Sequence, residues 1–178
     1  MKRDRSTVVV IDVQGKLADL MYERDNLYRQ LQIFLRGVRA LEIPTLWLEQ
    51  YPQGLGPTAP EIAELLAGLQ PIAKTSFSAC GAEQFLVDLR KTEAETVFIV
   101  GIESHVCVYQ TARDLLAAGF AVEVVSDAVS SRTESNCRLG LRRMAEVGTS
   151  ITSVEMALFE LLRDAKDPAF KEVARLVR

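Results

Sequence analysis

The stretch TVFIVGIESHVCVYQTARDLLAAG, residues 96–119, joins a continuous apolar run to an amphipathic helical pattern that stops at a glycine. The run Thr96–Gly101 is apolar at nearly every position, which is typical of a strand covered on both faces. The segment Val106–Ala118 has helical periodicity, and Gly119 behind it is a strong stop signal. This unit therefore predicts a parallel sheet packed between helices.

The same alternation of short apolar runs and amphipathic stretches extends along the whole chain. The irregular segment Gln50–Ala59, QYPQGLGPTA, is expected to be a loop at a strand end, so we predict a single domain over residues 1–178. The predicted strands are Thr7–Asp12, Thr45–Glu49, Pro71–Lys74, Thr96–Gly101, Ala121–Ser126 and Thr149–Thr152. The predicted helices are Asn26–Leu41, Pro60–Leu66, Ala82–Arg90, Val106–Ala118, Glu134–Glu146, Val154–Arg163 and Pro168–Val177.

The composition narrows the class of protein. The chain has 178 residues and a formal net charge of −3, with charges of both signs interspersed. No basic stripe predicts a nucleic-acid partner, and no polybasic block predicts a membrane surface. No apolar run approaches the roughly 20 residues that cross a bilayer, and the N-terminal run ending at Asp12 is too short for a signal peptide. Three cysteines without framework spacing predict free thiols in a reducing compartment, hence a cytoplasmic protein.

Chemically capable side chains are predicted to meet at one edge of the sheet. Open parallel sheets bind ligands at the carboxyl ends of the strands where the strand order reverses, which for the order 3-2-1-4-5-6 lies between the first and fourth strands. Asp12 ends the first strand, and Cys107 follows the fourth strand near a helix start. Lys74 ends the third strand at the same edge. Strand spacing puts that strand roughly 10 Å from the first, so spacing alone leaves the reach of Lys74 open.

Together these three groups could lower the energy of a proton transfer. A free thiol titrates at about 8.5 and a free aspartate at about 3.9, so moving the proton from thiol to carboxylate is uphill by about 6 kcal/mol. We expect burial to raise the pKa of Asp12, and Lys74 and the helix terminus to lower the pKa of Cys107. Asp12 would then act as general base toward a Cys107 nucleophile. Cys107 should also alkylate faster than Cys80 or Cys137 near neutral pH.

Other polar and aromatic side chains near these strand ends have structural interpretations beside functional ones. His105, the only histidine, could be a general base. However, it lies before the helix and two residues from Cys107, which favours a side chain that points away from the thiol. Aromatic residues near strand ends belong to the core about as often as to a pocket. The candidates for substrate contact are Gln14, Tyr51, Phe77 and His105.

Five segments together resemble the isochorismatase-like cysteine hydrolases. Three of them are VVVIDVQGKL with Asp12, AKTSFSA with Lys74 and GIESHVCVYQTARDLL with Cys107. The other two are VEVVSDAVSSRTESN and GTSITSVEMALFELL. The segments EQYPQGLGPTAPEI and DPAFKEVARLV are similar to the isochorismatase domain-containing subgroup and to related bacterial cysteine hydrolases. The resemblance runs from about Val8 to Leu176.

The resemblance implies an α/β fold, a three-layer α/β/α sandwich with a parallel six-stranded sheet in the order 3-2-1-4-5-6. It implies Cys107 as nucleophile, Asp12 as base and Lys74 as charged partner, in an enzyme without a cofactor that acts on a small molecule and forms a homo-oligomer. Many members hydrolyse C–N bonds of small amides, and others cleave a vinyl ether. The nicotinamidase branch has a metal-binding Asp-x-His after its second strand, where residues 49–52 of this chain read EQYP. We therefore expect neither a metal nor nicotinamidase activity.

The resemblance also implies a non-proline cis peptide before the cysteine, at Ile102–Glu103. A metal-free hydrolase must stabilise the negative charge that develops on the substrate oxygen with hydrogen-bond donors. The N–H of Cys107 lies near a helix start, where donors lack intrahelical partners. A second donor is expected from residues 101–106.

Three other functions stay open at this stage. One is a binding or interaction protein that keeps the triad without using it. A nucleotide-binding doubly wound domain is disfavoured, because no G-x-G-x-x-G or P-loop follows the first strand. A cysteine enzyme with a nucleophile elbow is disfavoured, because Val106 and Val108, not glycines, flank Cys107.

Overall fold

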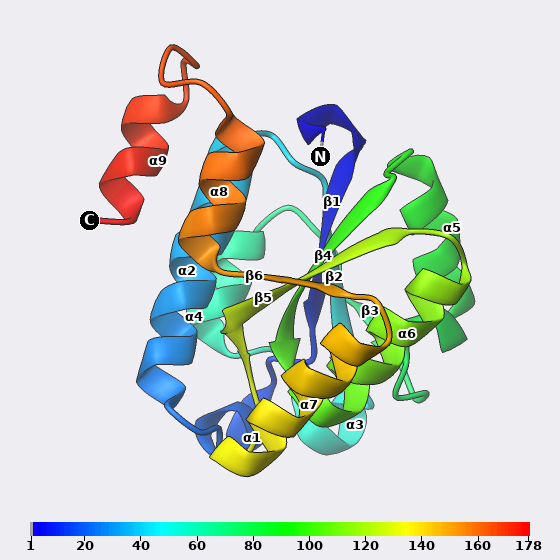
Figure 1. Ribbon diagram of the computed structural model, residues 1–178. Coiled ribbons are helices and arrows are strands. Elements are labelled where there is room, and N and C mark those ends of the chain that lie inside the picture. Colours follow the sequence, from blue (N-terminus) through cyan, green and yellow to red (C-terminus); the bar gives the residue numbers. More distant parts are fainter. Residues whose placement is uncertain (1) are drawn as a thin grey trace.

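The sheet of this protein is parallel throughout, and its strand order is the predicted one. The computed structural model describes residues 2–178 and contains one six-stranded sheet, ordered β3-β2-β1-β4-β5-β6 (Figure 1). β1 pairs in parallel with β2 on one side and with β4 on the other, so the strand order reverses there. The strands are β1 (Ser6–Ile11), β2 (Thr45–Gln50), β3 (Ile72–Lys74), β4 (Thr96–Ile102), β5 (Ala121–Ser130) and β6 (Ser150–Thr152).

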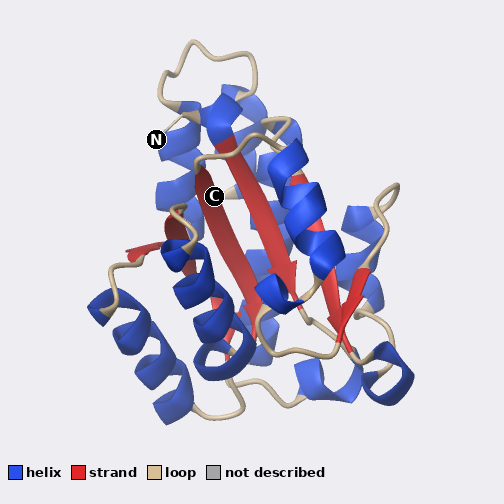
Figure 2. Cartoon of the chain, turned by 90° about the vertical axis from the view of Figure 1, so that its right-hand side faces the viewer, coloured by secondary structure: helices blue, strands red, loops and turns tan. Residues whose placement is uncertain are grey.

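Helices cover both faces of the sheet and complete the three expected layers. One apolar cluster joins the sheet to α2, α4, α8 and α9, and a second joins its other face to α5, α6 and α7 (Figure 1). Figure 2 shows the strands lying between these helical layers. The α-helices are α1 (Gly15–Asp19), α2 (Arg24–Ala40), α3 (Pro52–Leu55), α4 (Pro60–Ala63), α5 (Glu83–Lys91), α6 (Tyr109–Ala117), α7 (Glu134–Glu146), α8 (Val154–Leu162) and α9 (Phe170–Leu176).

The core forms where the apolar runs predicted it. Every residue of β1 and β4 is buried, which is the expected environment of a central strand with helices on both faces. Helix α2 turns its apolar stripe toward this sheet, and its Phe34 ring lies 6.1 Å from the ring of Phe98 in β4. The central strands are therefore packed on both faces, and the chain segments that leave their carboxyl ends start from this packed core.

Some elements differ from the predicted ones. The loop expected over Gln50–Ala59 contains the short helix α3, because Pro52 at its first position has the backbone angle that starts a helix. Helix α1 begins shortly after β1, at Gly15, and was not expected from the pattern. β5 continues to Ser130, past its predicted end at Ser126, and its register with β4 shifts between Ile99 and Gly101. No helix within residues 2–178 is long and apolar enough to span a membrane.

One glycine allows the two central strands to approach each other at the carboxyl edge. Gly101 has a φ of +113°, and a Cβ at this position would collide with the backbone of Ile11 in β1. A side chain is therefore excluded twice, by conformation and by space. This close approach places the residues after β1 beside the residues after β4.

Candidate active site

Asp12 follows β1 at the place where the strand order reverses. Its amide N–H donates to the Leu48 carbonyl of β2 at 3.2 Å, and its φ is +54°. Only 2% of the residue is exposed. Because an ionised carboxylate is costly to bury without partners, the contacts of Asp12 determine whether its charged form is stable and whether it can accept a proton.

Lys74 does reach Asp12, which settles the distance that strand spacing alone left open. Its ammonium donates to Asp12 Oδ2 at 2.7 Å, and the lysine side chain is fully buried. The same Nζ also donates to Gln50 Oε1 at 2.6 Å and to the carbonyl oxygens of Ser76 and Phe77 at 3.2 and 3.1 Å. The cation is therefore fixed by four acceptors and has no free proton to offer a substrate.

Gln50 and Gln14 hold this arrangement, and sequence reasoning missed the part played by Gln50. The Gln50 amide group bridges Lys74 and the Thr75 carbonyl oxygen, to which it donates at 2.8 Å. Gln14 is fully buried; its Nε2 donates to the Gln50 and Gly56 carbonyls at 3.0 and 2.8 Å, and its Oε1 accepts from the Gln50 N–H at 2.6 Å. Gln14 thus ties the loop after β2 to the end of β1, and its contact with a substrate stays a prediction.

Cys107 lies in a turn of π-helix, η4 (Ser104–Val108), that leads into α6. It is 7% exposed. Burial and the Asp12 carboxylate raise the pKa of this thiol to about 12, against the smaller opposing effect of Lys74. Our expectation of a lowered thiol pKa is therefore wrong: Lys74 is already neutralised by Asp12, and desolvation disfavours the thiolate. The resting thiol is protonated.

The Asp12 carboxylate is prepared to receive that proton. Burial raises its pKa, as expected, while the charge and hydrogen bond of Lys74 and a contact with Cys107 lower it in part. Oδ2 is occupied by Lys74, but Oδ1 is buried without a hydrogen-bond partner. One oxygen of this buried carboxylate therefore has no hydrogen-bond partner, and the Cys107 thiol is near enough to the carboxylate to affect its pKa.

The peptide bond between Ile102 and Glu103 is cis, as predicted. The Glu103 carbonyl oxygen accepts from the N–H groups of Val106 and Val108 at 3.0 and 3.2 Å. Its carboxylate accepts from the backbone N–H and the Nε of Arg132 at 3.0 and 3.1 Å. Since the Val106 N–H is engaged in this turn, a second oxyanion donor would have to come from another residue of the 101–106 segment.

His105 is directed toward serine hydroxyls. Its Nδ1 lies 2.9 Å from Ser131 Oγ, which in turn lies 2.6 Å from Ser104 Oγ. Within the described residues, its side chain has no hydrogen bond to Asp12 or Cys107. The direct base role considered for His105 is therefore not supported by a contact.

Two exposed aromatic residues, Tyr51 and Phe77, contact Lys74 through their backbone atoms. Tyr51 is 53% exposed and Phe77 54% exposed. The Tyr51 N–H donates to the Lys74 carbonyl at 2.8 Å, and the Phe77 carbonyl accepts from the Lys74 ammonium. A cavity of about 280 Å³ is lined by Tyr51, Lys74, Ser76 and their neighbours. The two aromatic candidates thus lie near the site, and their contact with substrate stays a prediction.

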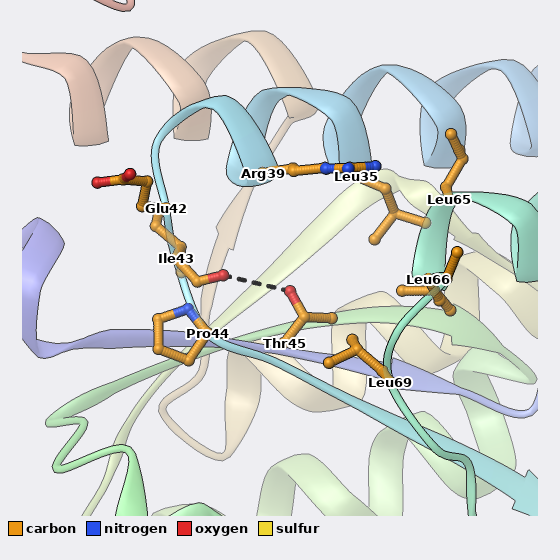
Figure 3. A pocket seen from close by; sticks show the side chains of 10 residues that line it. Leu35, Arg39, Glu42, Ile43, Pro44, Thr45, Leu65, Leu66 and Leu69 are labelled. Atoms are coloured by element: carbon orange, nitrogen blue, oxygen red, sulfur yellow. Dashed lines mark hydrogen bonds between the residues drawn. The ribbon is translucent and has the colours of Figure 1, made fainter.

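A second cavity, of about 330 Å³, opens at the opposite edge of the sheet. It is lined by the end of α2 and the start of β2, with Leu35, Arg39 and Leu69 around it (Figure 3). Asp12, Lys74 and Cys107 do not line it. Within residues 2–178, no group of three or more His, Cys, Asp or Glu side chains is arranged to hold a metal ion.

Known proteins resemble this chain both in sequence and in fold. Residues 6–156 match the sequence model of the isochorismatase domain. Human isochorismatase domain-containing protein 2 is 42% identical over 173 residues, which cover 97% of this chain and 83% of that protein. The structure of MAR1 ribonuclease from Caenorhabditis elegans matches with a TM-score of 0.93 at 37% identity, covering 99% of this chain and 91% of that one. The YcaC gene product of Escherichia coli, described as an octameric hydrolase of unknown specificity, shares the fold with a TM-score of 0.93 at 24% identity, covering 99% and 88%.

Proposed function

This chain belongs to the isochorismatase family and is a hydrolase by that kinship, and from this premise we propose that it cleaves a small acyl compound, most simply an amide, with Cys107 as nucleophile. The observation that carries the proposal is the state of Asp12. One oxygen of this carboxylate is held by Lys74, the other is buried without a hydrogen-bond partner, and the Cys107 thiol is near enough to the carboxylate to lower its pKa. A carboxylate with a purely structural role would be expected to use both oxygens as hydrogen-bond acceptors, whereas a general base needs one oxygen free to accept a proton.

In the proposed reaction, the Cys107 sulfur attacks the carbonyl carbon of the substrate while its proton passes to Asp12 Oδ1. The tetrahedral intermediate then collapses, and protonated Asp12 gives the proton to the leaving amine. This leaves an acyl-thioester on Cys107. Asp12 next takes a proton from water, which attacks the thioester, and the thiol is restored by return of that proton. No cofactor takes part in these steps.

The proton transfer is coupled to substrate binding. At rest the proton stays on sulfur, because burial and the Asp12 carboxylate raise the pKa of the Cys107 thiol to about 12. Attack on a carbonyl removes the negative charge from sulfur as it forms, so the high thiol pKa is no obstacle once an electrophile is in place. The charge and hydrogen bond of Lys74 lower the pKa of Asp12 in part and so favour its ionised form. The charge that moves to the substrate oxygen is proposed to be met by the Cys107 N–H and a second backbone donor.

The partners follow from the same proposal. We assign a small-molecule substrate, a cytoplasmic location and a homo-oligomer in which a neighbouring subunit closes the shallow pocket. The Escherichia coli relative of the same fold is an octamer. The Caenorhabditis elegans relative is named a ribonuclease, but a net charge of −3 without a basic stripe disfavours RNA as substrate here.

A panel of small amides, esters and vinyl ethers, assayed on the wild type and on Cys107→Ala, tests the proposal. We expect turnover of at least one amide by the wild type and none by the variant. The absence of turnover on the whole panel would favour the binding-protein alternative, whereas slow labelling of the resting Cys107 thiol by iodoacetamide would not, because its raised pKa keeps it protonated. Turnover that survives in Cys107→Ala would exclude this thiol as the nucleophile. A structured RNA in the same panel tests the ribonuclease reading.

A further inference from the structure

The turn that contains Cys107 packs against helix α7. This helix lies beside α6, the helix into which η4 leads, on one face of the sheet (Figure 1). Gly140, in the interior of α7, is buried and faces the peptide bond between Ser104 and His105. A Cβ at position 140 would lie 2.7 Å from the Ser104 carbonyl carbon and 2.8 Å from the His105 amide nitrogen. Backbone atoms cannot swing aside as the end of a side chain can, so no side chain at 140 is compatible with the present position of η4.

Gly140 has no local reason to be in this helix. Its φ lies outside the left-handed region, so the backbone of α7 would accept any residue that favours a helix. Glycine is among the least favourable residues in a helix interior, and alanine is the most favourable. Gly140 therefore opposes the local preference of α7, and the close approach of η4 is the physical reason for its presence.

Side chains reinforce the same contact. The Ser104 hydroxyl lies 2.6 Å from the Ser131 hydroxyl and donates to the Cys137 carbonyl of α7 at 3.4 Å. Ser104 and Ser131 are fully buried, and the Ser131 hydroxyl also lies 2.9 Å from His105 Nδ1. The residues that precede the thiol are thus tied to α7 and to the segment that leads into it.

The two partners of the proposed proton transfer are held by different parts of the structure. Asp12 is fixed at the end of β1 by Lys74, whereas Cys107 belongs to η4. The position of the thiol relative to the carboxylate therefore depends on where η4 lies. Reacting groups must be within hydrogen-bond reach of each other, and a misplacement of about 1 Å can cost about 10²-fold in rate.

We propose that Gly140 is a positioning residue for the nucleophile: because it lacks a side chain, η4 packs directly on α7, and this contact places Cys107 at Asp12. The inference rests on the proposed function, since it concerns the nucleophile of that reaction. A residue of α7 that takes no chemical part would then control the rate.

Gly140→Ala tests the proposal. The added methyl group favours the helix but must displace the peptide bond between Ser104 and His105 by several tenths of an ångström. We expect kcat for any substrate found to fall about 10-fold or more, with KM changed less than about threefold, because alignment and not binding is lost. We also expect iodoacetamide to label Cys107 about 10-fold faster at pH 8, since a displaced thiol loses part of the burial and of the Asp12 contact that keep it protonated.

Gly37→Ala is the matched control. Gly37 is also buried inside a helix, α2, and a Cβ there would lie 2.5 Å from Cδ2 of Leu158 in α8. That contact is made by the end of a side chain, on the face of the sheet opposite to η4. The control should keep the kcat and the labelling rate of the wild type. A labelling rate that does not rise in Gly140→Ala, or an equal rise in Gly37→Ala, would overturn the inference.

A second pair of variants loosens the same contact without adding an atom, and so keeps the test open if the first variant does not fold. Ser131→Ala removes the hydroxyl that contacts Ser104 and His105, and it should raise the labelling rate about threefold. Ser130→Ala is its control, because that hydroxyl donates to the Tyr22 carbonyl and has no hydrogen bond to η4. Equal labelling of the thiol in these two variants would contradict the proposal.

Failure of this inference and failure of the proposed function give different results. Labelling needs no substrate, so an unchanged rate in Gly140→Ala refutes the positioning role alone. A substrate panel without turnover refutes the proposed function alone.

Discussion

Replacing Asp12 by asparagine should make the Cys107 thiol more reactive toward an alkylating agent while abolishing hydrolysis. After burial, the Asp12 carboxylate is the largest cause of the raised pKa of this thiol. Asparagine keeps the shape of the side chain and removes the charge. The Lys74 ammonium keeps three other acceptors, on Gln50, Ser76 and Phe77, so the site should survive the change.

The magnitude follows from the charge that is removed. With a pKa of about 12, the thiol is ionised to about one part in 10⁴ at pH 8. Two like charges about 5 Å apart, at an effective dielectric constant of about 20, interact by about 3 kcal/mol, or about two pH units. The asparagine variant should therefore lower the pKa of Cys107 by about one to two units. Its thiolate fraction at pH 8, and with it the alkylation rate, rises about 10- to 100-fold.

Iodoacetamide labelling at pH 8, followed by peptide mapping, separates Cys107 from Cys80 and Cys137. Cys80, whose pKa burial raises to about 11, serves as the internal control and should label equally in both proteins. A companion variant, Lys74→Met, should have the opposite effect, because loss of the cation disfavours the thiolate. An alkylation rate of Cys107 that is unchanged or lower in Asp12→Asn would refute the assignment of Asp12 as its charged neighbour.

Three further predictions test other parts of the description. The free energy of unfolding should fall with rising pH between about 9 and 12. The pKa of Cys107 is near 12 in the folded state and 9.0 in the unfolded state, so the folded protein binds more protons in this range. In denaturant titrations, Cys107→Ala should reduce this fall by about 1.4 kcal/mol per pH unit. Light scattering should give a multiple of 19.8 kDa, and the monomer mass at dilute concentration would contradict the homo-oligomer. Elemental analysis of purified protein should give far less than one zinc or iron per chain, and a value near one would contradict the metal-free mechanism.

The amino-acid pattern predicted a parallel sheet covered by helices, and the family resemblance supplied its six strands and their order. Continuous apolar runs such as the one ending at Asp12 can only be central strands, since both faces must be covered, and helical stretches between them force parallel crossovers. That pattern placed Asp12 and Cys107 at the same edge. Family resemblance, rather than periodicity, supplied the cis bond at Ile102–Glu103.

Local elements were less predictable where the chain is short or polar. Helix α3 arises inside a segment rich in proline and glycine, and the extension of β5 to Ser130 depends on pairing with β4. The extension of β5 is decided by a strand that lies far away in the sequence, whereas α3 begins locally at Pro52. The hydrophobic periodicity of a segment shows which of its own faces is apolar. It contains no information on neighbours that are distant in the sequence.

The sequence by itself determined the fold class and which residue types stand at the carboxyl edge, because burial of apolar runs is a property of the chain. Only the tertiary structure decided the electrostatics of that edge. It brought Lys74 against Asp12, placed Gln50 beside Lys74, and buried Cys107 deeply enough to raise its pKa where we expected it lowered. The physical reason is that a pKa depends on desolvation and on charges within a few ångströms, and these distances exist only after strands far apart in the sequence have paired.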